Sequence, residues 1–394
     1  MQRMIPPSYR ATVSALAAGQ LLLWAALYYA FTSFVLPMQR ELGWDKALMM
    51  GAFTLGLALW GVGSYAVGAA IDQGHGRAVL SGGAALAGFG FVGWAFVTAP
   101  WMLYAVWALL GAAMSMTLYD PAFNVLTKRY PVRYREGITM LTLVGGFAST
   151  LCYPAVALLI PALGWRGALA AIGAVLLAVA PLQAWALRGP AIVAAPSAHD
   201  ARDDATLHEA LRESSFWLLT LCFTCYAFAS GALWAHMAPA FAAKGVSEAD
   251  ALWVVMAVGP AQVAGRLVYA ALGQRWSLRV LGCIVLGGLP ISLALFALSN
   301  RFAVLLLFAL LFGIANGLVT IIRGGLVPQY FGRTHVGRIG GAMSSIGLFS
   351  RAAAPVVMAA LLLLLPGYRE AVLVLAGLGV LSVLAFWAAR PPSG

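Results

Sequence analysis

Long apolar stretches, separated by short polar segments, follow one another along almost the whole chain. Each stretch has about 20 residues or more, the length with which an α-helix crosses the hydrocarbon core of a bilayer. None alternates between apolar and polar residues as the strands of a membrane barrel do. The pattern predicts an all-α polytopic membrane protein with twelve transmembrane helices, over residues 12–36, 47–71, 78–98, 101–127, 137–160, 166–187, 215–241, 248–273, 279–299, 302–327, 339–365 and 370–389.

One long polar stretch divides these predicted helices into six and six. It covers residues 188–214, and its second part, 204–215, has the pattern of a short amphipathic surface helix. We therefore expect an N-terminal six-helix bundle over residues 1–187, a cytoplasmic linker over 188–214 and a C-terminal six-helix bundle over 215–394.

The two halves resemble each other after a shift of about 202 residues. This predicts a duplicated six-helix unit, and parallel repeats of that kind place a substrate site near the membrane midplane between the halves. Chance matches in a chain with 43 glycines are the alternative explanation. The matching positions are Gly43–Ala47 with Gly245–Ala249, Gly111 with Gly313, and Pro154 with Pro355.

Composition agrees with a membrane protein, because 62% of the residues are hydrophobic and only 9% are charged. Soluble domains have roughly 45–50% apolar and about 25% charged residues. A chain so poor in charge cannot cover a water-facing surface, which argues against a soluble enzyme, a disordered scaffold and a secreted disulfide module.

The net charge of +11 comes from basic residues in the predicted loops. If the N-terminus is cytoplasmic, the inner segments hold fifteen Lys and Arg residues and the outer loops hold six. This asymmetry predicts that both termini are cytoplasmic, in a multi-pass protein of the cell inner membrane. The charge thus reflects orientation in a lipid bilayer, and no nucleic acid partner is expected.

Several kinds of chemistry find no support in the sequence. There is no Gly-Lys-Ser phosphate loop, so ATP-driven pumping is not expected. Neither metal-ligand spacing nor a nucleophile–base–acid set occurs, so we expect no metal, no cofactor and no enzyme activity. The four cysteines, which lie inside apolar stretches, are expected to pack as small hydrophobic residues.

The end of the second predicted helix carries a motif that suits a reversible contact. It reads Gly68-Ala-Ala-Ile-Asp72-Gln-Gly-His75-Gly76-Arg77. Gly68 allows close helix approach, Asp72 can accept hydrogen bonds from a helix N-terminus or an arginine, and Gly76 allows a tight turn. The motif resembles the loop between helices 2 and 3 of the major facilitator superfamily. That resemblance implies two six-helix bundles, alternating access, and a cytoplasmic gating latch containing Gly68, Asp72 and Arg77.

The match is incomplete at two places. Gln73 stands where the superfamily often has a basic residue, and the second-half counterpart, residues 273–275, lacks the acid. A second latch is therefore not expected.

A narrower resemblance covers most of the chain and concerns the monocarboxylate and oxalate/formate branch of the superfamily. It implies that Arg266 holds a substrate carboxylate and that Arg351 supplies a second cation. Gln262 stands where proton-coupled carriers of the branch have an aspartate, so their proton coupling is not carried over. The resemblance rests on Leu36-Pro37, Glu41-Leu-Gly-Trp44, Asp120-Pro-Ala122, Gly164-Trp-Arg166, Thr206–Arg212, Phe216-Trp217 and Gly259–Arg266.

Physical reasoning leads to the same arginines. A charge inside a membrane helix costs at least ~2.5–3.5 kcal/mol on insertion scales, so Arg266 and Arg351 need a partner or a water-filled cavity. Two guanidinium groups facing one cavity suit a planar anion, since each can bind a carboxylate in a bidentate manner. The alternative is that each arginine bonds backbone carbonyls or extends to the membrane interface.

Other polar and aromatic residues extend this hypothesis. Asp120 and Arg323 occupy near-equivalent helices of the two halves and could form a gate pair, with a bolder possibility of proton coupling through Asp120. Alternatively, Asp120 caps local structure before Pro121, and Arg323 lies at the interface. Helical spacing also makes cavity-lining residues of Tyr28, Tyr226, Trp234 and Asn316, although such residues more often pack inside. Gln262, one turn before Arg266, is expected among the substrate-binding residues.

Together these features predict a secondary transporter, expected to be monomeric, that moves a small mono- or dicarboxylate by alternating access. Protons or a counter-anion are the open choices for a coupled partner. Two alternatives remain: an efflux pump for a larger amphipathic compound, and a transporter-like sensor that binds a ligand without moving it. The short linker argues against the sensor, because it leaves little room for a signalling partner.

Overall fold

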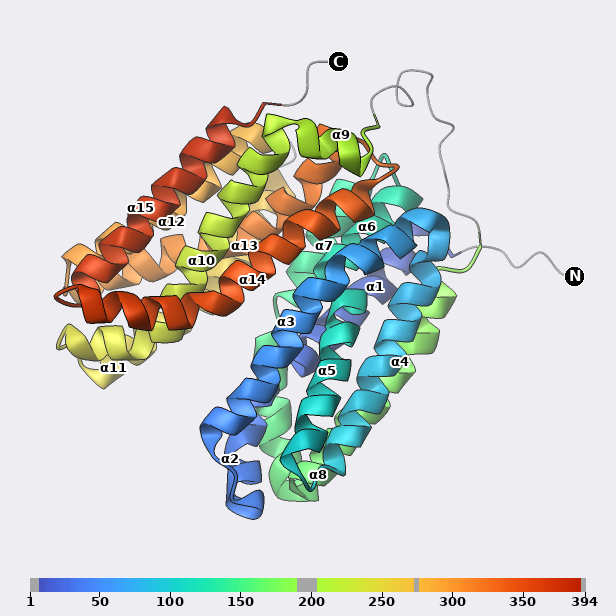
Figure 1. The fold of residues 1–394 in the computed structure, drawn as a ribbon, viewed down its shortest axis with the longest axis horizontal. Coiled ribbons are helices and arrows are strands. Elements are labelled where there is room, and N and C mark those ends of the chain that lie inside the picture. The colour runs from blue at the N-terminus through green and yellow to red at the C-terminus, as the bar shows by residue number, and fades with distance from the viewer. Residues whose placement is uncertain (1–6, 190–203, 273–275, 391–394) are drawn as a thin grey trace, which may run out of the picture. The chain divides into compact units, whose positions relative to one another are not determined.

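The computed structural model describes residues 7–189, 204–272 and 276–390, and within them every regular element is helical (Figure 1). Ten of the helical segments are long and apolar enough to cross a membrane. The fold is therefore the expected all-α polytopic membrane protein. The prediction about residues 273–275 lies outside the described residues.

Two of these segments are each long enough for two crossings. Lys46–Ala95 has 50 residues and Tyr134–Ala186 has 53, whereas one crossing takes about 20. Each is broken at a glycine with left-handed backbone, Gly74 (φ 92°) in the first and Gly164 (φ 68°) in the second. The tight turn in the Asp72 motif is thus made by Gly74, and the expectation for Gly76 was wrong. Twelve helices with cytoplasmic termini stay a prediction.

The chain forms two compact units. The first contains residues Met1–Asp204 and Gly332–Ser345. In it α4 packs against α5 and α8, α3 packs against α5, and α1 packs against α7 and α8. Its elements are α1 (Tyr9–Trp24), η1 (Ala25–Tyr29), α2 (Phe31–Leu42), α3 (Lys46–Ala70), η2 (Ile71–His75), α4 (Gly76–Ala95), α5 (Pro100–Thr117), α6 (Tyr119–Arg129), α7 (Tyr134–Gly145), α8 (Ala148–Ala186) and the start of α14 (Val336–Leu364).

The second unit contains residues Ala205–Phe331 and Ile346–Gly394. Here α13 packs against α11 and α12, and α15 packs against α10 and α12. Gly332–Ser345 belongs with the first unit, and the boundary after Asp204 falls inside the predicted linker. The expected bundles over residues 1–187 and 215–394 stay a prediction. The elements are α9 (Leu207–Arg212), α10 (Ser214–Ala243), α11 (Glu248–Leu272), α12 (Leu278–Leu298), α13 (Phe302–Phe331), α15 (Tyr368–Ala388) and the rest of α14.

Equivalent close contacts occur in both units. A methyl group at Gly111 of α5 would collide with the backbone of Gly56 on α3. A methyl group at Gly313 of α13 would lie 2.6 Å from the carbonyl oxygen of Val258 on α11. The second pair lies 202 residues after the first in both members, so the packing follows the repeat seen in the sequence.

The short helix expected before the seventh span is present as α9. Its N-cap is Thr206, whose side chain accepts a hydrogen bond from the Glu209 N–H, while the Glu209 carboxylate accepts one from the Thr206 N–H. This reciprocal capping box satisfies two of the donors that a helix N-terminus leaves without partners.

The membrane span predicted over residues 101–127 is present as one segment, Pro100–Arg129. It is interrupted at Leu118, whose extended backbone separates α5 from α6. Pro121 has no N–H and cannot bond the carbonyl of Thr117, its partner four residues earlier. The side chain of Gln20 donates to that carbonyl instead, at 2.6 Å. A buried glutamine on α1 thus compensates for a proline in another helix.

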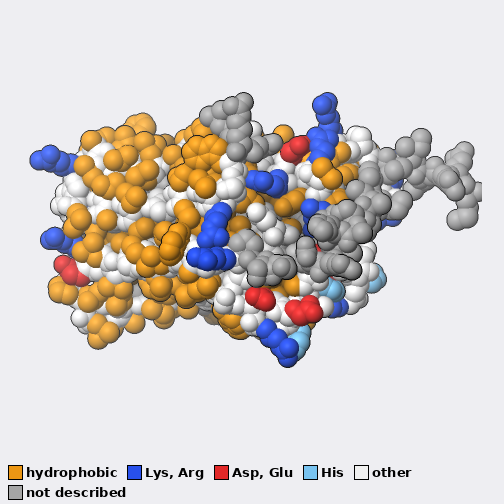
Figure 2. All heavy atoms as spheres, turned by 90° about the horizontal axis from the view of Figure 1, so that it is seen from above, with side chains coloured by type: hydrophobic (Ala, Val, Ile, Leu, Met, Phe, Trp, Pro, Cys, Tyr) orange, Lys and Arg blue, Asp and Glu red, His pale blue; other side chains and the backbone are white. Residues whose placement is uncertain are grey.

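Large apolar side chains are exposed around the helices of both units. Hydrophobic side chains cover wide areas of the face in Figure 2, where charged side chains occur in small groups. A surface of this kind suits contact with lipid rather than with water. Strongly exposed examples are Phe96, Trp101, Leu158, Trp253, Val356 and Leu363.

Candidate functional site

Asp72 lies in η2, directly after α3, and binds the N-terminus of α14 within the first unit. Its Oδ1 accepts a hydrogen bond from the Gly337 N–H at 3.0 Å, and its Oδ2 accepts one from the Arg338 N–H at 2.8 Å. The first N–H groups of a helix have no partner inside the helix, and they carry the positive end of its dipole. A carboxylate with only 3% of its side chain exposed is therefore well matched to this place.

Lys128 at the end of α6 completes the group, which we call the Asp72 cluster (Gly68, Asp72, Lys128, Gly337 and Arg338). Its Nζ lies 3.3 Å from Asp72 Oδ1 and also donates to the backbone carbonyls of Asp72 and Thr334. One ammonium group thus binds the carboxylate and the loop before α14 together.

Close backbone packing supports the Asp72 cluster. A methyl group at Gly68 would collide with the carbonyl of Gly337, and one at Gly337 would collide with the carbonyl of Gly68. One turn further along α14, a methyl group at Gly341 would lie 2.6 Å from the Ser64 carbonyl oxygen. The Ser345 hydroxyl donates to the Gly61 carbonyl at 2.7 Å. Small residues on both helices allow this contact.

Arg77, the basic residue expected in the latch, is exposed and has no ion pair or side-chain hydrogen bond among the described residues. Lys128 occupies the position next to Asp72 instead. The sequence contained a signal for it, since Lys128 begins the densest basic group of the chain, with Arg129, Arg133 and Arg135.

Asp204, which lies inside the predicted linker, forms hydrogen bonds with the loop that precedes α14. Asp204 Oδ1 accepts a hydrogen bond from the Arg333 N–H at 2.7 Å, and the Thr334 hydroxyl donates to Oδ2. Since Lys128 binds the Thr334 carbonyl, the loop before α14 is held by an acid and a base at once.

Arg266 is buried inside α11, with 4% of its surface exposed. Its Nε donates to the carbonyl of Gly317 on α13 at 3.0 Å. This is the backbone-carbonyl contact anticipated as an alternative to substrate binding. Gln262, one turn earlier, is half-buried and packs with its backbone against Gly317.

Arg351 lies on α14 in the second unit and is exposed. Its aliphatic part contacts Gly231 on α10, where an added methyl group would lie 3.3 Å from Cγ. The guanidinium group is also near enough to Tyr226 of α10 to act on it electrostatically. The Tyr226 hydroxyl is buried and has no hydrogen-bond partner in the described part of the chain. A buried donor of this kind is costly unless a ligand or water satisfies it.

The other predicted lining residues have varied surroundings. Tyr28 is half-buried in the π-helical turn η1, and its ring lies 5.4 Å from that of Trp24. Trp234 is half-exposed and stacks on Phe312 at 6.2 Å. Asn316 donates to the Phe312 carbonyl in its own helix at 2.8 Å. Short π-helical turns are rare in proteins overall, but those that occur are often found at functional sites. This favours Tyr28 as a cavity-lining residue over the others.

Asp120 and Arg323, the predicted gate pair, belong to different units. Asp120 is in the first turn of α6, directly after the Leu118 break, where the helix dipole favours an acid. Arg323 is half-buried on α13. Their pairing stays a prediction.

The opposite end of the first unit carries a second polar group. Glu41 accepts hydrogen bonds from the Trp165 indole at 2.5 Å and from Arg166 Nε at 3.0 Å. Arg166 also donates to the carbonyls of Ala95 and Val97. The hydrogen bond from Trp165, followed by the bond and charge of Arg166, lowers the pKa of Glu41.

The second unit has an uneven distribution of charge. No Asp or Glu occurs in the sequence from residue 251 to residue 369. Three arginines of that stretch lie more than five residues from either end of a membrane-length helix, namely Arg266, Arg323 and Arg351. Among the described residues of the whole chain, no group of three or more His, Cys, Asp or Glu side chains could hold a metal ion.

Two helical units built from membrane-length helices define a polytopic membrane transporter fold, and comparison with known proteins agrees. The sequence profile of the Major Facilitator Superfamily matches residues 16–241 and 219–394. The chain therefore belongs to the Major Facilitator Superfamily, as the Asp72 motif had suggested. It is a multi-pass membrane transporter and not an enzyme.

Solved structures share the fold across almost the whole chain. The *E. coli* fucose:proton symporter FucP (N162A) superposes with a TM-score of 0.75 at 14% identity, covering 98% of this chain and 100% of that one. The human organic anion transporter MFSD10 (TETRAN) has a TM-score of 0.74 at 18% identity, covering 96% and 100%.

Curated relatives match over shorter stretches. An uncharacterized 38 kDa protein in the 23S RNA operon of *Thermoproteus tenax* is 33% identical over 171 residues, which are 42% of this chain and 44% of that protein. Monocarboxylate transporter 11 of *Homo sapiens* is 38% identical over 117 residues, 29% and 25% of the two chains. The match thus spans less than half of each relative.

Proposed function

We propose that this transporter moves a small organic anion, a mono- or dicarboxylate, across the inner membrane by alternating access. The observation that carries the proposal is the charge of the second unit. Three arginines lie more than five residues from the ends of its membrane-length helices, within 119 residues that contain no acid. In a medium of low dielectric constant such an excess of positive charge favours an anionic ligand.

Arg266 and Arg351 bind the carboxylate in this proposal. The Nε bond to Gly317 orients the Arg266 guanidinium, whose planar form suits a bidentate contact with a carboxylate. The buried Tyr226 hydroxyl near Arg351 supplies a neutral donor to the same ligand. The names of two similar proteins, a monocarboxylate transporter and an organic anion transporter, point to the same substrate class.

The Asp72 cluster acts as the inner gate in this scheme. Its carboxylate holds α3 to the start of α14 through backbone N–H groups, so opening must separate this contact. Asp120 and Arg323 form a second gate contact, which breaks and re-forms during the cycle.

A thermal-shift screen in detergent against small carboxylates tests the proposal, because a ligand in excess over its Kd raises the melting temperature. We expect one carboxylate family to stabilise the wild type and not the Arg266→Lys or Arg351→Lys variant. Lysine keeps the charge but loses the bidentate geometry. Arg301→Lys, at an exposed position before α13, is the matched control.

Counterflow in proteoliposomes then separates transport from binding alone. Exchange of a labelled carboxylate supports the transporter, whereas a thermal shift without flux indicates a sensor. If hydrophobic cations or neutral compounds stabilise the protein and carboxylates do not, the efflux function replaces the anion proposal.

A further inference from the structure

His236 of α10 is hydrogen-bonded through both of its ring nitrogens to two other helices of the second unit. Its Nε2 lies 3.0 Å from the carbonyl oxygen of Pro355 on α14. Its Nδ1 lies 3.2 Å from the hydroxyl oxygen of Tyr368, the first residue of α15. One imidazole ring thus joins three membrane-length helices, and the proposed anion site uses neither His236 nor Tyr368.

The two partners determine which nitrogen carries the hydrogen of the neutral ring. A carbonyl oxygen only accepts, so Nε2 of neutral His236 carries the hydrogen and donates to Pro355. Nδ1 then has a lone pair and accepts from the Tyr368 hydroxyl. A hydroxyl group both donates and accepts, so its oxygen can also accept from Nδ1 once that nitrogen is protonated. Both charge states of the ring are therefore hydrogen-bonded at both nitrogens.

The position of His236 also suits exchange of a proton with water. The side chain is half-buried, and it lies in the last third of α10 (Ser214–Ala243) rather than at the centre of that helix. Histidine is the side chain that changes its charge between pH 5 and pH 8. An ionisable side chain inside a membrane-length helix is costly and is often part of a proton or substrate pathway.

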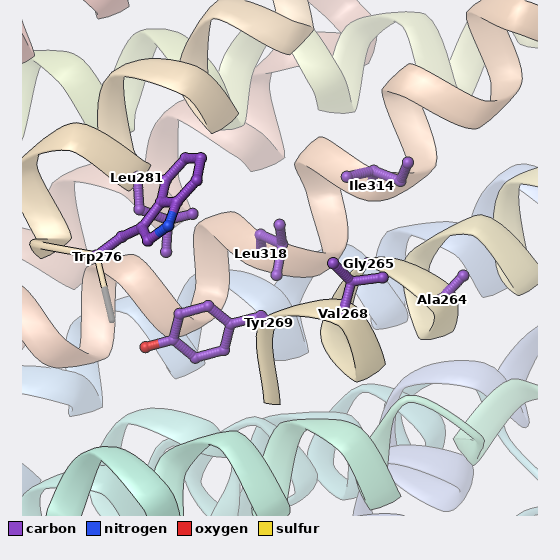
Figure 3. Close-up of a pocket in the computed structure, with 8 residues that line it drawn as sticks. All are labelled: Ala264, Gly265, Val268, Tyr269, Trp276, Leu281, Ile314 and Leu318. Atoms are coloured by element: carbon purple, nitrogen blue, oxygen red, sulfur yellow. The ribbon is translucent and has the colours of Figure 1, made fainter. Parts of the chain in front are cut away.

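The apolar pocket of the second unit offers no comparable site. It has a volume of about 260 Å³ and lies between α11, α13 and the beginning of α12 (Figure 3). None of its lining residues is charged, and only Tyr269 and Trp276 among them have a polar side-chain atom. A charged group would lose its hydration there without gaining a partner. His236, in contrast, has one partner for each nitrogen.

The charged groups nearest to the two partners lie on α14 and α15. Arg351 precedes Pro355 by one turn of α14, and its aliphatic part contacts Gly231 of α10. It is the one charged residue of α14 within the second unit, since the part of α14 from residue 346 onward has no other. On α15, Arg369 and Glu370 follow Tyr368 directly and have opposite charges. Arg351 therefore leaves an excess of positive charge beside His236.

The other helices packed against α10 bring their charged residues to its end. They are Lys244 directly after α10, Glu248 and Asp250 in the first turn of α11, and Arg301 before α13. On α12 the charged residue is Arg279, at the opposite end, where it donates to the Trp387 carbonyl. None of these residues is bonded to the His236 ring.

We propose that His236 is a proton-binding site of this transporter, at which a proton taken up by Nδ1 reverses the Tyr368 hydrogen bond and adds a positive charge one turn from Arg351. The proton comes from water and is held by the Nδ1 lone pair, while the Tyr368 hydroxyl changes from donor to acceptor. The added charge strengthens the attraction for an anion, so proton and anion favour each other's binding. This coupling rests on the proposed anion site, but proton binding by His236 does not.

Nitrogen-15 NMR of the full chain in nanodiscs, with its five histidines labelled, tests proton binding directly. The His236 signals are those lost in His236→Gln and kept in His208→Gln, which changes an exposed histidine of α9. We expect the Nε2–H tautomer at pH 8 and a doubly protonated ring at pH 5. An Nδ1–H tautomer at the higher pH, or a ring that stays neutral at the lower one, would overturn the proposal.

Tyr368→Phe gives a second assignment that does not remove the histidine. The variant deletes the hydroxyl bonded to Nδ1, so the Nδ1 signal of His236 should shift while its Nε2 signal, set by Pro355, should change little. An unchanged Nδ1 signal contradicts the assigned hydrogen bond.

The link to Arg351 is measured by the same titration. Arg351→Gln removes a neighbouring positive charge, so the midpoint of the His236 titration should move to higher pH. Arg212→Gln, which removes an exposed arginine before the other end of α10, should leave the midpoint unchanged. Equal midpoints for Arg351→Gln and the wild type contradict the electrostatic link. None of these titrations needs a carboxylate, so failure of the proton site and failure of the anion proposal are recognised separately.

Discussion

The backbone N–H of Arg338 donates a 2.8 Å hydrogen bond to Oδ2 of Asp72, across 266 residues of sequence. Asp72 therefore recognises the start of α14 through the main chain rather than through the arginine side chain. Such an arrangement depends on a carboxylate at position 72 and on a free helix N-terminus, and it tolerates changes in the side chain at position 338.

We expect Asp72→Asn to weaken the contact between α3 and α14, because one carboxylate oxygen is replaced by an amide donor. Hydrogen bonds to charged groups contribute about 1.5–3 kcal/mol, and a loss of that order should lower the melting temperature in detergent. Arg338→Ala should have a much smaller effect. The control is Asp45→Asn, at an exposed helix start without a side-chain cap. Equal melting temperatures for Asp72→Asn and Asp45→Asn would contradict the role of the main-chain bond.

Substitution of Lys128 and substitution of Arg77 should affect stability differently, although both are basic residues near Asp72. Lys128→Ala removes an ion pair and two hydrogen bonds to backbone carbonyls, and should cost about 1 kcal/mol or more. Arg77→Ala removes an exposed side chain and should leave stability within about 0.5 kcal/mol of the wild type. Chemical denaturation of both variants in one detergent compares them, and a larger loss for Arg77→Ala would refute the assignment of Lys128.

Alanine substitutions at two glycines of α14 distinguish a steric effect on stability from an effect of helix propensity. Gly337→Ala places a methyl group against the Gly68 carbonyl and 2.9 Å from Asp72 Oδ1, and overpacking of this kind costs about 1–3 kcal/mol. Gly347→Ala meets no atom within 4 Å and should stabilise the helix by about 0.5–1 kcal/mol. The two variants should therefore shift the melting temperature in opposite directions. A common direction would show that the close approach at Gly68 does not limit α14.

Gln20 and Pro121 should be energetically coupled through the Thr117 carbonyl. Gln20→Leu leaves that carbonyl without its 2.6 Å donor, which should cost about 1–3 kcal/mol. Adding Pro121→Ala restores an N–H that can bond Thr117 within the helix, so the double variant should recover part of the loss. Gln39→Leu, at an exposed position, is the control for Gln20. Additive effects in the double-mutant cycle would show that the two residues act independently.

Glu41 should make stability depend on acid pH. The Trp165 hydrogen bond and the Arg166 charge lower the pKa of this carboxyl, so it contributes stability above the ordinary value of about 4.3 and loses it as pH falls through the lowered value. Glu41→Gln should therefore reduce the melting temperature at pH 7, and its difference from the wild type should shrink toward pH 3. A pH-independent difference would assign the effect to packing.

Much of the fold could be predicted because its cause is local. Apolar stretches of membrane length predict helices, and the amphipathic pattern of residues 204–215 predicted α9, whose capping groups are only three residues apart. The break at Leu118 was missed because it depends on more than Pro121. A proline can stay inside a membrane helix, and here the freed carbonyl is bonded by Gln20, about a hundred residues earlier in the chain.

The sequence by itself determined that the chain is a helical membrane protein with basic residues inside its membrane helices, because length, hydropathy and charge are properties of residue order. Its resemblance to the Major Facilitator Superfamily added the transporter function. The sequence also marked Asp72 as an acid suited to a helix N-terminus. Only the tertiary structure decided which helix Asp72 binds, that Lys128 and not Arg77 joins it, and that Arg266 bonds Gly317. Hydrogen bonds act over about 3 Å, so their partners are selected by helix packing and not by distance along the chain.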